Sequence, residues 1–353
     1  MSAQDLTSEL QQRLQQAIAS HTPVRVVGAD TKAFYGLTGS ANVTLSVQAH
    51  QGVIAYEPSE LVIRVRSGTT VREITTLLAE QGQMLAFEPP MFDERATIGG
   101  TLACGFAGPR RPFAGSARDF VLGCRLLNGR AEVVNFGGQV IKNVAGFDVS
   151  RLMVGALGQL GIILDISLRV LPRPAAELTL CHHQPDPNVA LAFMQRWQRQ
   201  PWPLSGLCYV DQSIRVRLSG ASSAISAVAK QLGGELDSAG ALFWEQLREQ
   251  QLAFFQGPEK LWRLSVPPAT PMLDLEGRWL LDWGGAQRWL KSSLPAATIH
   301  QLAKQYGGYA LCFRGDEQDW LRFEPELLAL QQQVRQAFDP GQLINPHRFS
   351  AVL

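Results

Sequence analysis

The sequence predicts an α+β protein made of two domains and a short C-terminal segment. At 353 residues the chain is long enough for two separate cores. Its apolar fraction of 46% and charged fraction of 18% are typical of a globular protein. Apolar runs broken by glycines end at Pro172 and Pro174, and all eight tryptophans follow within 175–325. We therefore expect a first domain over 1–174, a second over 175–325 and a final segment over 326–353.

The net charge, the hydropathy and the spacing of the cysteines argue against several classes of protein. A formal net charge of +1 gives no electrostatic argument for binding nucleic acid or an anionic membrane. No apolar run approaches the roughly 18–20 residues of a spanning helix, and no secretion signal is recognisable. The five cysteines never form C-x-x-C, which argues against a disulfide framework, a structural zinc or an iron–sulfur cluster held by this chain alone. We expect a cytoplasmic protein with reduced thiols and no metal site.

The first elements of the chain predict a helix, a strand and an anion-binding loop. Apolar residues recur every four positions near the N-terminus: Leu6, Leu10, Leu14 and Ile18. This spacing predicts an amphipathic helix over residues 1–20. Val24–Val27 reads as a short strand that runs into the small-residue loop Gly28–Lys32. Such a loop presents consecutive backbone N–H groups to phosphate oxygens, although an ordinary β-turn is the simpler alternative.

Local signals also place the next elements. Leu61–Val65 alternates as a strand, and Thr70 with Glu73 forms a capping box for a helix that reaches about Glu80. The stretch Ile98–Gly100 would begin another helix, whose free N–H groups suit an anion.

A hairpin is the clearest local prediction. Phe120–Leu127 and Ala131–Phe136 are two apolar runs joined by Asn128-Gly129, which predicts a type I′ turn. Ile162–Val170 follows as a buried strand by its β-branched content.

The second domain alternates short strands with helices. Ser205–Val210 and Ser213–Leu218 are expected as strands, and Ala224–Leu232 and Ala241–Gln251 as helices. This pattern predicts a small α+β cap over an antiparallel sheet. Glu324–Phe338 is the last expected helix.

Familiar nucleotide motifs are missing. Gly155, Gly158 and Gly161 are spaced G-x-x-G-x-x-G, not G-x-G-x-x-G, and no G-x-x-x-x-G-K-[ST] occurs. A Rossmann dinucleotide domain and a P-loop NTPase are therefore poorly supported.

Two stretches carry a resemblance to a known family. They are Ala103–Pro112, which reads ACGFAGPRRP, and Lys142–Asp148, which reads KNVAGFD. With these stretches the chain resembles the FAD-binding domain of the vanillyl-alcohol oxidase/p-cresol methylhydroxylase flavoproteins, and within them the smaller FAD-binding subunits of bacterial glycolate oxidase. The resemblance runs from about Pro23 to Pro172 and returns at Phe338–Gly341 and Asn345-Pro346. It implies a two-subdomain FAD-binding domain with a smaller cap and a C-terminal return segment.

The resemblance also implies which residues bind FAD. For the pyrophosphate they are Gly28, Ala29, Asp30, Thr31, Lys32, Thr97, Ile98, Gly99 and Gly100. For the adenosine and the flavin ring they are Gly108, Gly115, Ser116, Arg118, Asp119, Gly161 and Ile162. Ala29 and Asp30 stand where the family pattern prefers glycine. We predict non-covalent FAD, because Val26–Lys32 holds no histidine that would attach it.

Oxidation of a 2-hydroxy acid such as glycolate needs a cation for the substrate carboxylate and a base for its hydroxyl proton. The candidate catalytic residues are Arg110 and Lys142, with Arg111 beside them, since a guanidinium suits a carboxylate. A surface or pyrophosphate-facing charge is the alternative interpretation. Related dehydrogenases carry a histidine-rich metal motif in the cap, for which we find no equivalent. His182 and His183 are adjacent on an expected strand, so their side chains point to opposite faces.

By resemblance, the chain is the FAD-binding subunit of a glycolate oxidase complex. Its partners would be a larger FAD-containing subunit and an iron–sulfur subunit that receives electrons as glycolate becomes glyoxylate. The chain would then lie in the cytoplasm and meet the inner membrane only through the complex. Two alternatives are a non-catalytic FAD-bearing relay or scaffold, and a stand-alone flavin oxidoreductase of the same fold.

Overall fold

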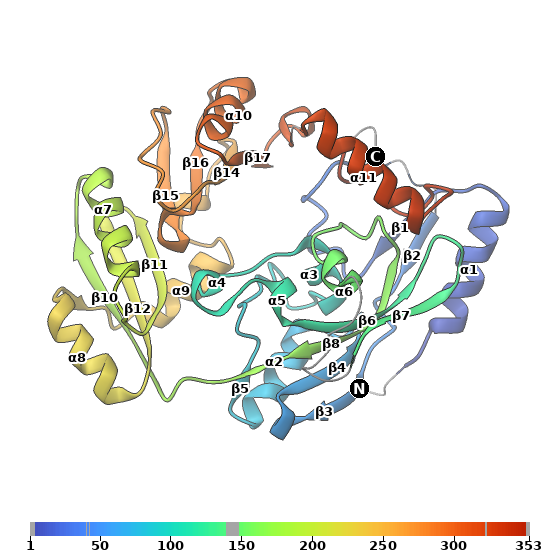
Figure 1. The fold of residues 1–353 in the computed structure, drawn as a ribbon, viewed down its shortest axis with the longest axis horizontal. Helices are drawn as coiled ribbons and strands as arrows, with labels where there is room; N and C mark the ends of the chain where they lie inside the picture. The colour runs from blue at the N-terminus through green and yellow to red at the C-terminus, as the bar shows by residue number, and fades with distance from the viewer. Residues whose placement is uncertain (1–3, 40, 42, 139–147, 322, 351–353) are drawn as a thin grey trace. The chain divides into compact units, whose positions relative to one another are not determined.

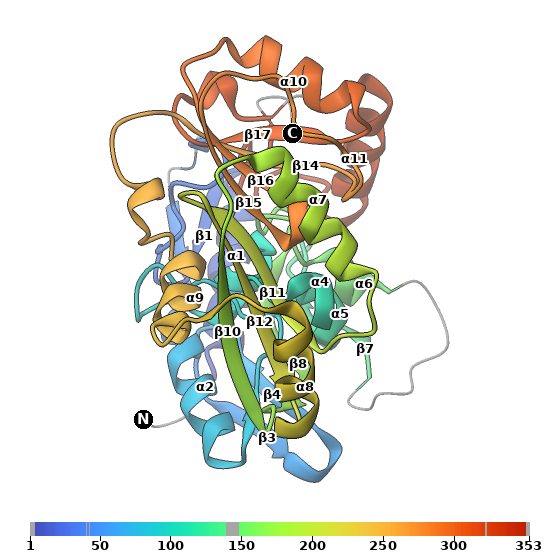
Figure 2. The same cartoon turned by 90° about the vertical axis from the view of Figure 1, so that its left-hand side faces the viewer.

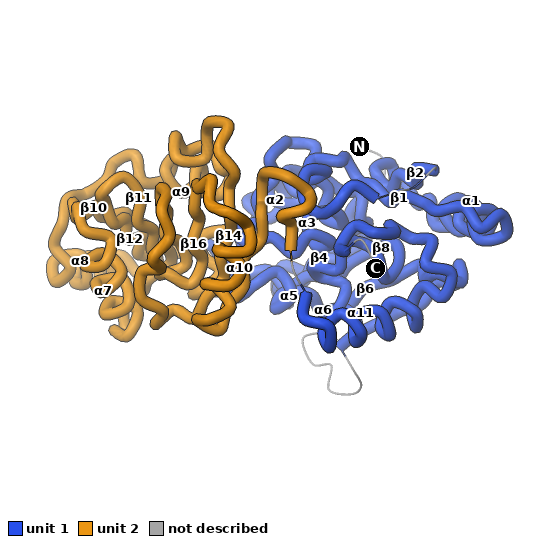
Figure 3. The backbone as a smooth tube through the Cα atoms, turned by 90° about the horizontal axis from the view of Figure 1, so that it is seen from above, with its two compact units in different colours: residues 1–107, 115–173, 323–353 blue, residues 108–114, 174–322 orange. Residues whose placement is uncertain are grey.

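The computed structural model describes residues 4–39, 41, 43–138, 148–321 and 323–350, and it confirms the α+β class (Figure 1). Packing of Cα atoms divides the chain into two compact units (Figure 3). Unit 1 comprises 1–107, 115–173 and 323–353, and unit 2 comprises 108–114 and 174–322. Segment 108–114, which the sequence analysis placed in the FAD-binding domain, groups with unit 2.

The described residues of unit 1 form one sheet of five strands and two sheets of two strands each. Its elements are α1 (Thr7–Ala19), β1 (Val24–Val27), β2 (Val43–Ser46), β3 (Val53–Glu57), β4 (Val62–Arg66), α2 (Val71–Glu80), β5 (Gln83–Met84), α3 (Ile98–Cys104), α5 (Ala117–Phe120), β6 (Val121–Leu127), β7 (Val133–Gly137), α6 (Val149–Leu152), β8 (Ile162–Arg169), β9 (Leu171–Pro172) and α11 (Pro325–Phe338). Strands β1 and β2 pair in parallel. Strands β3-β4-β8-β6-β7 form a five-stranded antiparallel sheet.

Helix α1 forms for the reason that its spacing predicts. Leu10 and Leu14 are buried in a core with Leu45 of β2, Leu164 of β8 and Ile344 near the C-terminus. Leu6 lies just before the first turn.

The N-cap half of the predicted capping box is present at the start of α2. The Thr70 side chain accepts a hydrogen bond from the Glu73 N–H at 3.1 Å, which satisfies a free donor of the first turn. The helix begins at Val71, and Gly82 beyond its end takes φ 63°.

The hairpin of β6 and β7 is confirmed, but its predicted type I′ turn is wrong. The strands pair Leu127 with Val133, so residues 128–132 form the loop. The left-handed residue is Ala131, at φ 57°, and the Asn128 side chain accepts from the N–H of Glu132. Gly129 instead donates its N–H to the Phe338 carbonyl at 2.9 Å. The hydrogen bond to Phe338, near the C-terminus, therefore favours this loop over the type I′ turn.

Unit 2 is built on one antiparallel sheet of eight strands in the order β13-β10-β12-β11-β15-β16-β14-β17. Its elements are α4 (Arg111–Ala114), β10 (Ala176–His183), α7 (Pro187–Gln198), β11 (Leu204–Val210), β12 (Ser213–Gly220), α8 (Ser222–Leu232), β13 (Glu235–Leu236), α9 (Gly240–Arg248), β14 (Leu261–Ser265), β15 (Arg278–Asp282), β16 (Gln287–Lys291), α10 (Ala296–Gln305) and β17 (Tyr309–Arg314).

Helices cover both faces of this sheet. Helices α7 and α8 share a core with strands β10–β12, over which they lie in Figure 2. Along β12, Val216 faces that core, whereas Arg217 faces the Trp244 ring of α9. Among the described residues, no helix is long and apolar enough to cross a membrane.

Candidate functional site

Unit 1 contains a cavity of about 110 Å³. Its walls come from parts of the chain that are distant in sequence: residues 25–32 of β1 and its loop, Val47, Ser67, Thr97 with α3, the turn at 157–163, and Asn345 and Arg348 near the C-terminus. Backbone N–H groups and positively charged side chains are thus gathered around one space.

Many residues predicted for the cofactor line this cavity. They are Gly28, Ala29, Asp30, Thr31, Lys32, Thr97, Gly99, Gly100 and Gly161. Others are not part of its lining. Ile98 is buried, Gly108 belongs to unit 2, and the remaining ones are Gly115, Ser116, Arg118, Asp119 and Ile162. The assignment of each residue to FAD stays a prediction.

Asp30 occupies its unusual position without leaving an uncompensated charge. Its backbone is left-handed, at φ 57°, a conformation that Asp tolerates better than most residues. Both of its carboxylate oxygens accept from Arg25 Nη2, at 2.7 and 2.6 Å. The ion pair offsets a negative charge that would otherwise repel an anion at the loop.

Lys32 is the cation of loop 28–32, and only 7% of its surface is exposed. Its Nζ donates to the Met91 carbonyl and to Thr31 Oγ1, each at 3.3 Å, and lies 5.8 Å from the centre of the Phe92 ring. A buried ammonium beside a nest of N–H groups suits a phosphate.

Cys104 lies on the cavity wall as a neutral thiol. Burial raises its pKa to about 11, although the charges of Lys32 and Arg348 act in the opposite direction. The thiolate form that reacts as a nucleophile is therefore rare near pH 7.

The backbone at the start of α3 approaches its neighbours closely. Thr97 caps the helix by accepting from the Gly100 N–H at 3.3 Å. A Cβ at Gly28 would lie 2.2 Å from Thr97 Oγ1, and one at Gly99 would lie 2.6 Å from Ser67 Cβ. Glycine is therefore required at 28 and 99 for the loop and the helix to meet.

Ser67 supplies an open hydrogen-bonding position at the wall. Its hydroxyl is buried and has no hydrogen-bond partner among the described residues. A buried polar group without a partner is costly, so this hydroxyl fits a bound polar ligand.

Several lining residues were not predicted from the sequence. Arg25 and Ser67 belong to no motif, and Cys104 lies in the stretch Ala103–Pro112, where no role was assigned to its side chain. Asn345 and Arg348 come from the return segment, where Asn345-Pro346 marked the family but gave no role to either side chain.

The candidate catalytic Arg110 is already engaged within unit 2. It is 8% exposed, and its guanidinium contacts Glu177 Oε2 at 2.6 Å and Ser219 Oγ at 3.2 Å. Burial raises the pKa of Glu177, but the charges of Arg217 and Arg110 and a hydrogen bond from Ser219 outweigh it and lower the pKa. A substrate carboxylate at Arg110 would have to compete with that of Glu177.

Of the other candidate residues, the structure describes Arg111, His182 and His183 but not Lys142. Arg111 stacks its guanidinium 4.2 Å from the centre of the Trp283 ring, and Lys142 lies outside the described residues. His182 and His183 are the last residues of β10, with His182 beside the Trp197 ring. The described residues contain no group of histidine, cysteine, aspartate or glutamate that could hold a metal ion.

Comparison with known proteins identifies the family. The family described as "FAD binding domain" matches residues 5–137. Glycolate oxidase subunit GlcE of Escherichia coli K12 is 46% identical over 351 residues, which cover 99% of both chains. The chain belongs to the GlcE family. This confirms the predicted resemblance.

Other relatives match part of the chain. D-lactate dehydrogenase of Anaerostipes hadrus is 30% identical over 163 residues, 45% of this chain and 33% of the relative. Glycolate oxidase subunit GlcD of Bacillus subtilis is 27% identical over 128 residues, 36% and 27% of the two chains. A solved structure of alkyldihydroxyacetonephosphate synthase matches with a TM-score of 0.65 at 13% identity, over 96% of this chain and 74% of that one. The structural match concerns the fold alone.

The chain belongs to a family of FAD-dependent oxidoreductases. Its cofactor is FAD, as predicted. The cavity has the chemistry that the cofactor needs. It offers a glycine-containing loop, an enclosed lysine and the unpaired Ser67 hydroxyl.

Proposed function

We propose that this chain is the FAD-binding subunit of a complex that oxidises glycolate to glyoxylate and passes the electrons through flavin to an iron–sulfur partner. The observation that carries the proposal is the 46% identity to a glycolate oxidase subunit across 99% of both chains. A larger FAD-containing subunit is the other proposed partner.

In this proposal the cavity of unit 1 holds the pyrophosphate part of the cofactor. The N–H groups of loop 28–32 and the ammonium of Lys32 bind the pyrophosphate, and Ser67 supplies a further hydrogen bond. FAD held by these residues would supply the two-electron redox chemistry that the proposed reaction needs. Attachment is non-covalent, because the lining contains no histidine and its Cys104 thiol stays neutral.

Arg110 favours a second candidate, in which the chain carries FAD as a relay or scaffold and the substrate binds to the partner. Its guanidinium is bound by Glu177 and Ser219, so the cation expected for the substrate carboxylate is occupied.

An anaerobic visible spectrum of the purified chain, recorded before and after addition of glycolate, separates the two. Bleaching of the flavin would show a substrate site on this chain. A flavin that stays oxidised with glycolate on the isolated chain, but bleaches in excess of the larger subunit's own flavin once that subunit is added, supports the relay. A chain that binds no FAD even when the cofactor is supplied would refute both.

Lys32→Met tests the cofactor site directly. Loss of a charge-assisted hydrogen bond in an enclosed site should weaken FAD binding roughly 10–100-fold. The dissociation constant can be measured from flavin fluorescence on deflavinated protein. Lys230→Met, an exposed position of α8, is the matched control. Equal affinity in the two variants would remove Lys32 from the site.

A further inference from the structure

The return segment, residues 343–348, lies against the strand that leads into the cofactor loop. Val24 donates its N–H to the Leu343 carbonyl at 2.8 Å, and Asn345 donates its N–H to the Val24 carbonyl at 2.9 Å. Ile344 forms a parallel bridge with Val24. The segment therefore pairs with the open side of β1.

Asn345 connects two walls of the cavity. Its Oδ1 accepts from the Val26 N–H at 2.7 Å, and its Nδ2 donates to the Leu157 carbonyl at 2.9 Å. The residue is 5% exposed and left-handed, at φ 45°. A Cβ at Gly158 would lie 2.7 Å from Asn345 Nδ2, so the glycine makes room for this contact.

Arg348 fixes the chain that continues from the cofactor loop. Its Nη1 donates to the Leu37 carbonyl at 2.9 Å and its Nη2 to the Tyr35 carbonyl at 2.7 Å. The Leu37 N–H donates back to the Arg348 carbonyl at 2.9 Å. Residues 33–37 follow Lys32 directly, so their position limits the conformations open to the loop.

We propose that Asn345 and Arg348 are positioning residues, which hold loop 28–32 and the 157–161 turn in the arrangement that binds FAD. This inference rests on the proposed assignment of the cavity to FAD. Arg348 acts through the fixed fork of its guanidinium, which spans two carbonyls, and not through its charge alone. A lysine keeps the charge but offers a single point of donation.

Arg348→Lys and Arg348→Ala separate geometry from charge. We expect both variants to bind FAD roughly tenfold more weakly than the parent chain, since each leaves loop carbonyls without the fork. Added guanidinium ion at a non-denaturing concentration should restore part of the affinity of Arg348→Ala. Arg130→Lys, on the exposed hairpin loop, is the matched control. An Arg348→Lys chain with parental affinity would overturn the positioning role.

Asn345→Asp provides a second variant that tolerates the left-handed backbone and keeps an acceptor for Val26. It lacks the donor for Leu157 and places a carboxylate against that carbonyl, so FAD should bind more weakly, and the deflavinated chain should unfold at a lower temperature than the parent while staying folded at the assay temperature. Parental FAD affinity would overturn the role of Asn345. A loss of affinity explained by general unfolding would also overturn it.

Hydrogen exchange of the deflavinated chain distinguishes failure of this inference from failure of the proposed function. The amides of the 157–161 turn should exchange faster in Asn345→Asp, and the Leu37 amide should exchange faster in Arg348→Ala, whether or not FAD is present. Unchanged exchange would refute the positioning contacts themselves. A parent chain that fails to bind FAD would instead refute the assignment of the cavity.

Discussion

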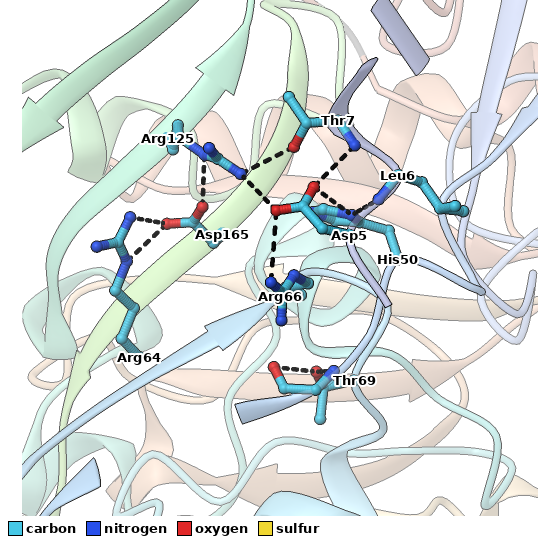
Figure 4. A network of polar contacts seen from close by, with 10 residues as sticks. Asp5, Leu6, Thr7, His50, Arg64, Arg66, Thr69, Arg125 and Asp165 are labelled. Atoms are coloured by element: carbon cyan, nitrogen blue, oxygen red, sulfur yellow. Dashed lines mark hydrogen bonds and ion pairs between the residues drawn. The ribbon is translucent and has the colours of Figure 1, made fainter. Parts of the chain in front are cut away.

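Asp165 is a buried carboxylate that pairs with two arginines of the central sheet of unit 1. It lies on β8 between Arg64 of β4 and Arg125 of β6 (Figure 4). Arg64 Nη2 is 2.7 Å from Oδ1, and Arg125 Nε is 2.6 Å from Oδ2. Arg125 also donates to Thr7 Oγ1 at 2.8 Å, so the network reaches the start of α1.

Asp165→Asn keeps the shape of the side chain and removes its charge. Breaking a buried ion pair costs about 3–5 kcal/mol. The Asp165 side chain is 2% exposed, but its arginine partners are 24% and 23% exposed. Water can therefore solvate the released guanidinium groups in part, and we expect a loss of about 3 kcal/mol in the free energy of unfolding.

Thermal unfolding followed by circular dichroism measures the effect. At about 2–4 °C per kcal/mol, the midpoint should fall by about 6–12 °C. Glu9→Gln is the control, because Glu9 pairs with Arg13 at 4.0 Å on the exposed face of α1 and should contribute less than about 0.5 kcal/mol. A loss in Asp165→Asn no larger than in this control would refute the reasoning. It would show that the arginines do not need the carboxylate.

Three further changes test separate features of the chain. Arg25→Ala should weaken FAD binding about two- to fivefold by leaving the Asp30 charge uncompensated, and Arg25→Ala with Asp30→Gly should restore it, as measured by flavin fluorescence. Gly129→Ala should lower the free energy of unfolding by about 1–3 kcal/mol in urea titrations, because its Cβ would lie 2.4 Å from Asp339 Cα. For Glu177 the pKa is lower in the folded state. The stability advantage of the parent chain over Glu177→Gln should therefore be complete above pH 4.5, near the ordinary pKa, and should be lost as the pH falls below it in urea unfolding at several pH values.

Each of these tests has an outcome that contradicts it. A double variant at positions 25 and 30 as weak as the single one would deny that Asp30 repels the cofactor. A free energy of unfolding equal to that of the parent chain in Gly129→Ala would mean that Asp339 can move away from residue 129 at little cost. A stability difference at Glu177 that grows on acidification would reverse the sign of its pKa shift.

Structural features that depend on residues close together in the sequence could be predicted. Thr70 and Glu73 are three residues apart, so the start of α2 follows from local hydrogen bonding alone. The two apolar runs that became β6 and β7 likewise predicted the hairpin. The loop 28–32 was predicted because a strand that ends at small residues exposes its N–H groups.

Features set by distant contacts could not be predicted. The type I′ turn at Asn128-Gly129 is the locally favoured solution, and it loses because Gly129 is bound to Phe338 far along the chain. Asn345 meets Val26 across 319 positions, and no spacing rule relates such residues. Arg110 looked like a free cation within a motif, but Glu177 of β10 neutralises it.

The walls of the cavity come from distant parts of the chain, so we expect FAD binding and folding of unit 1 to depend on each other. The strand β1, the start of α3, the 157–163 turn and the return segment each supply part of the wall, so an unfolded chain offers no such site. A ligand that binds only the folded chain stabilises it in proportion to the logarithm of ligand concentration over the dissociation constant. The buried Ser67 hydroxyl, which has no hydrogen-bond partner among the described residues, costs stability while no ligand is bound. FAD should therefore act as a structural element of unit 1 as well as a redox centre, and the return segment makes that coupling possible by joining the last residues of the chain to its first strand.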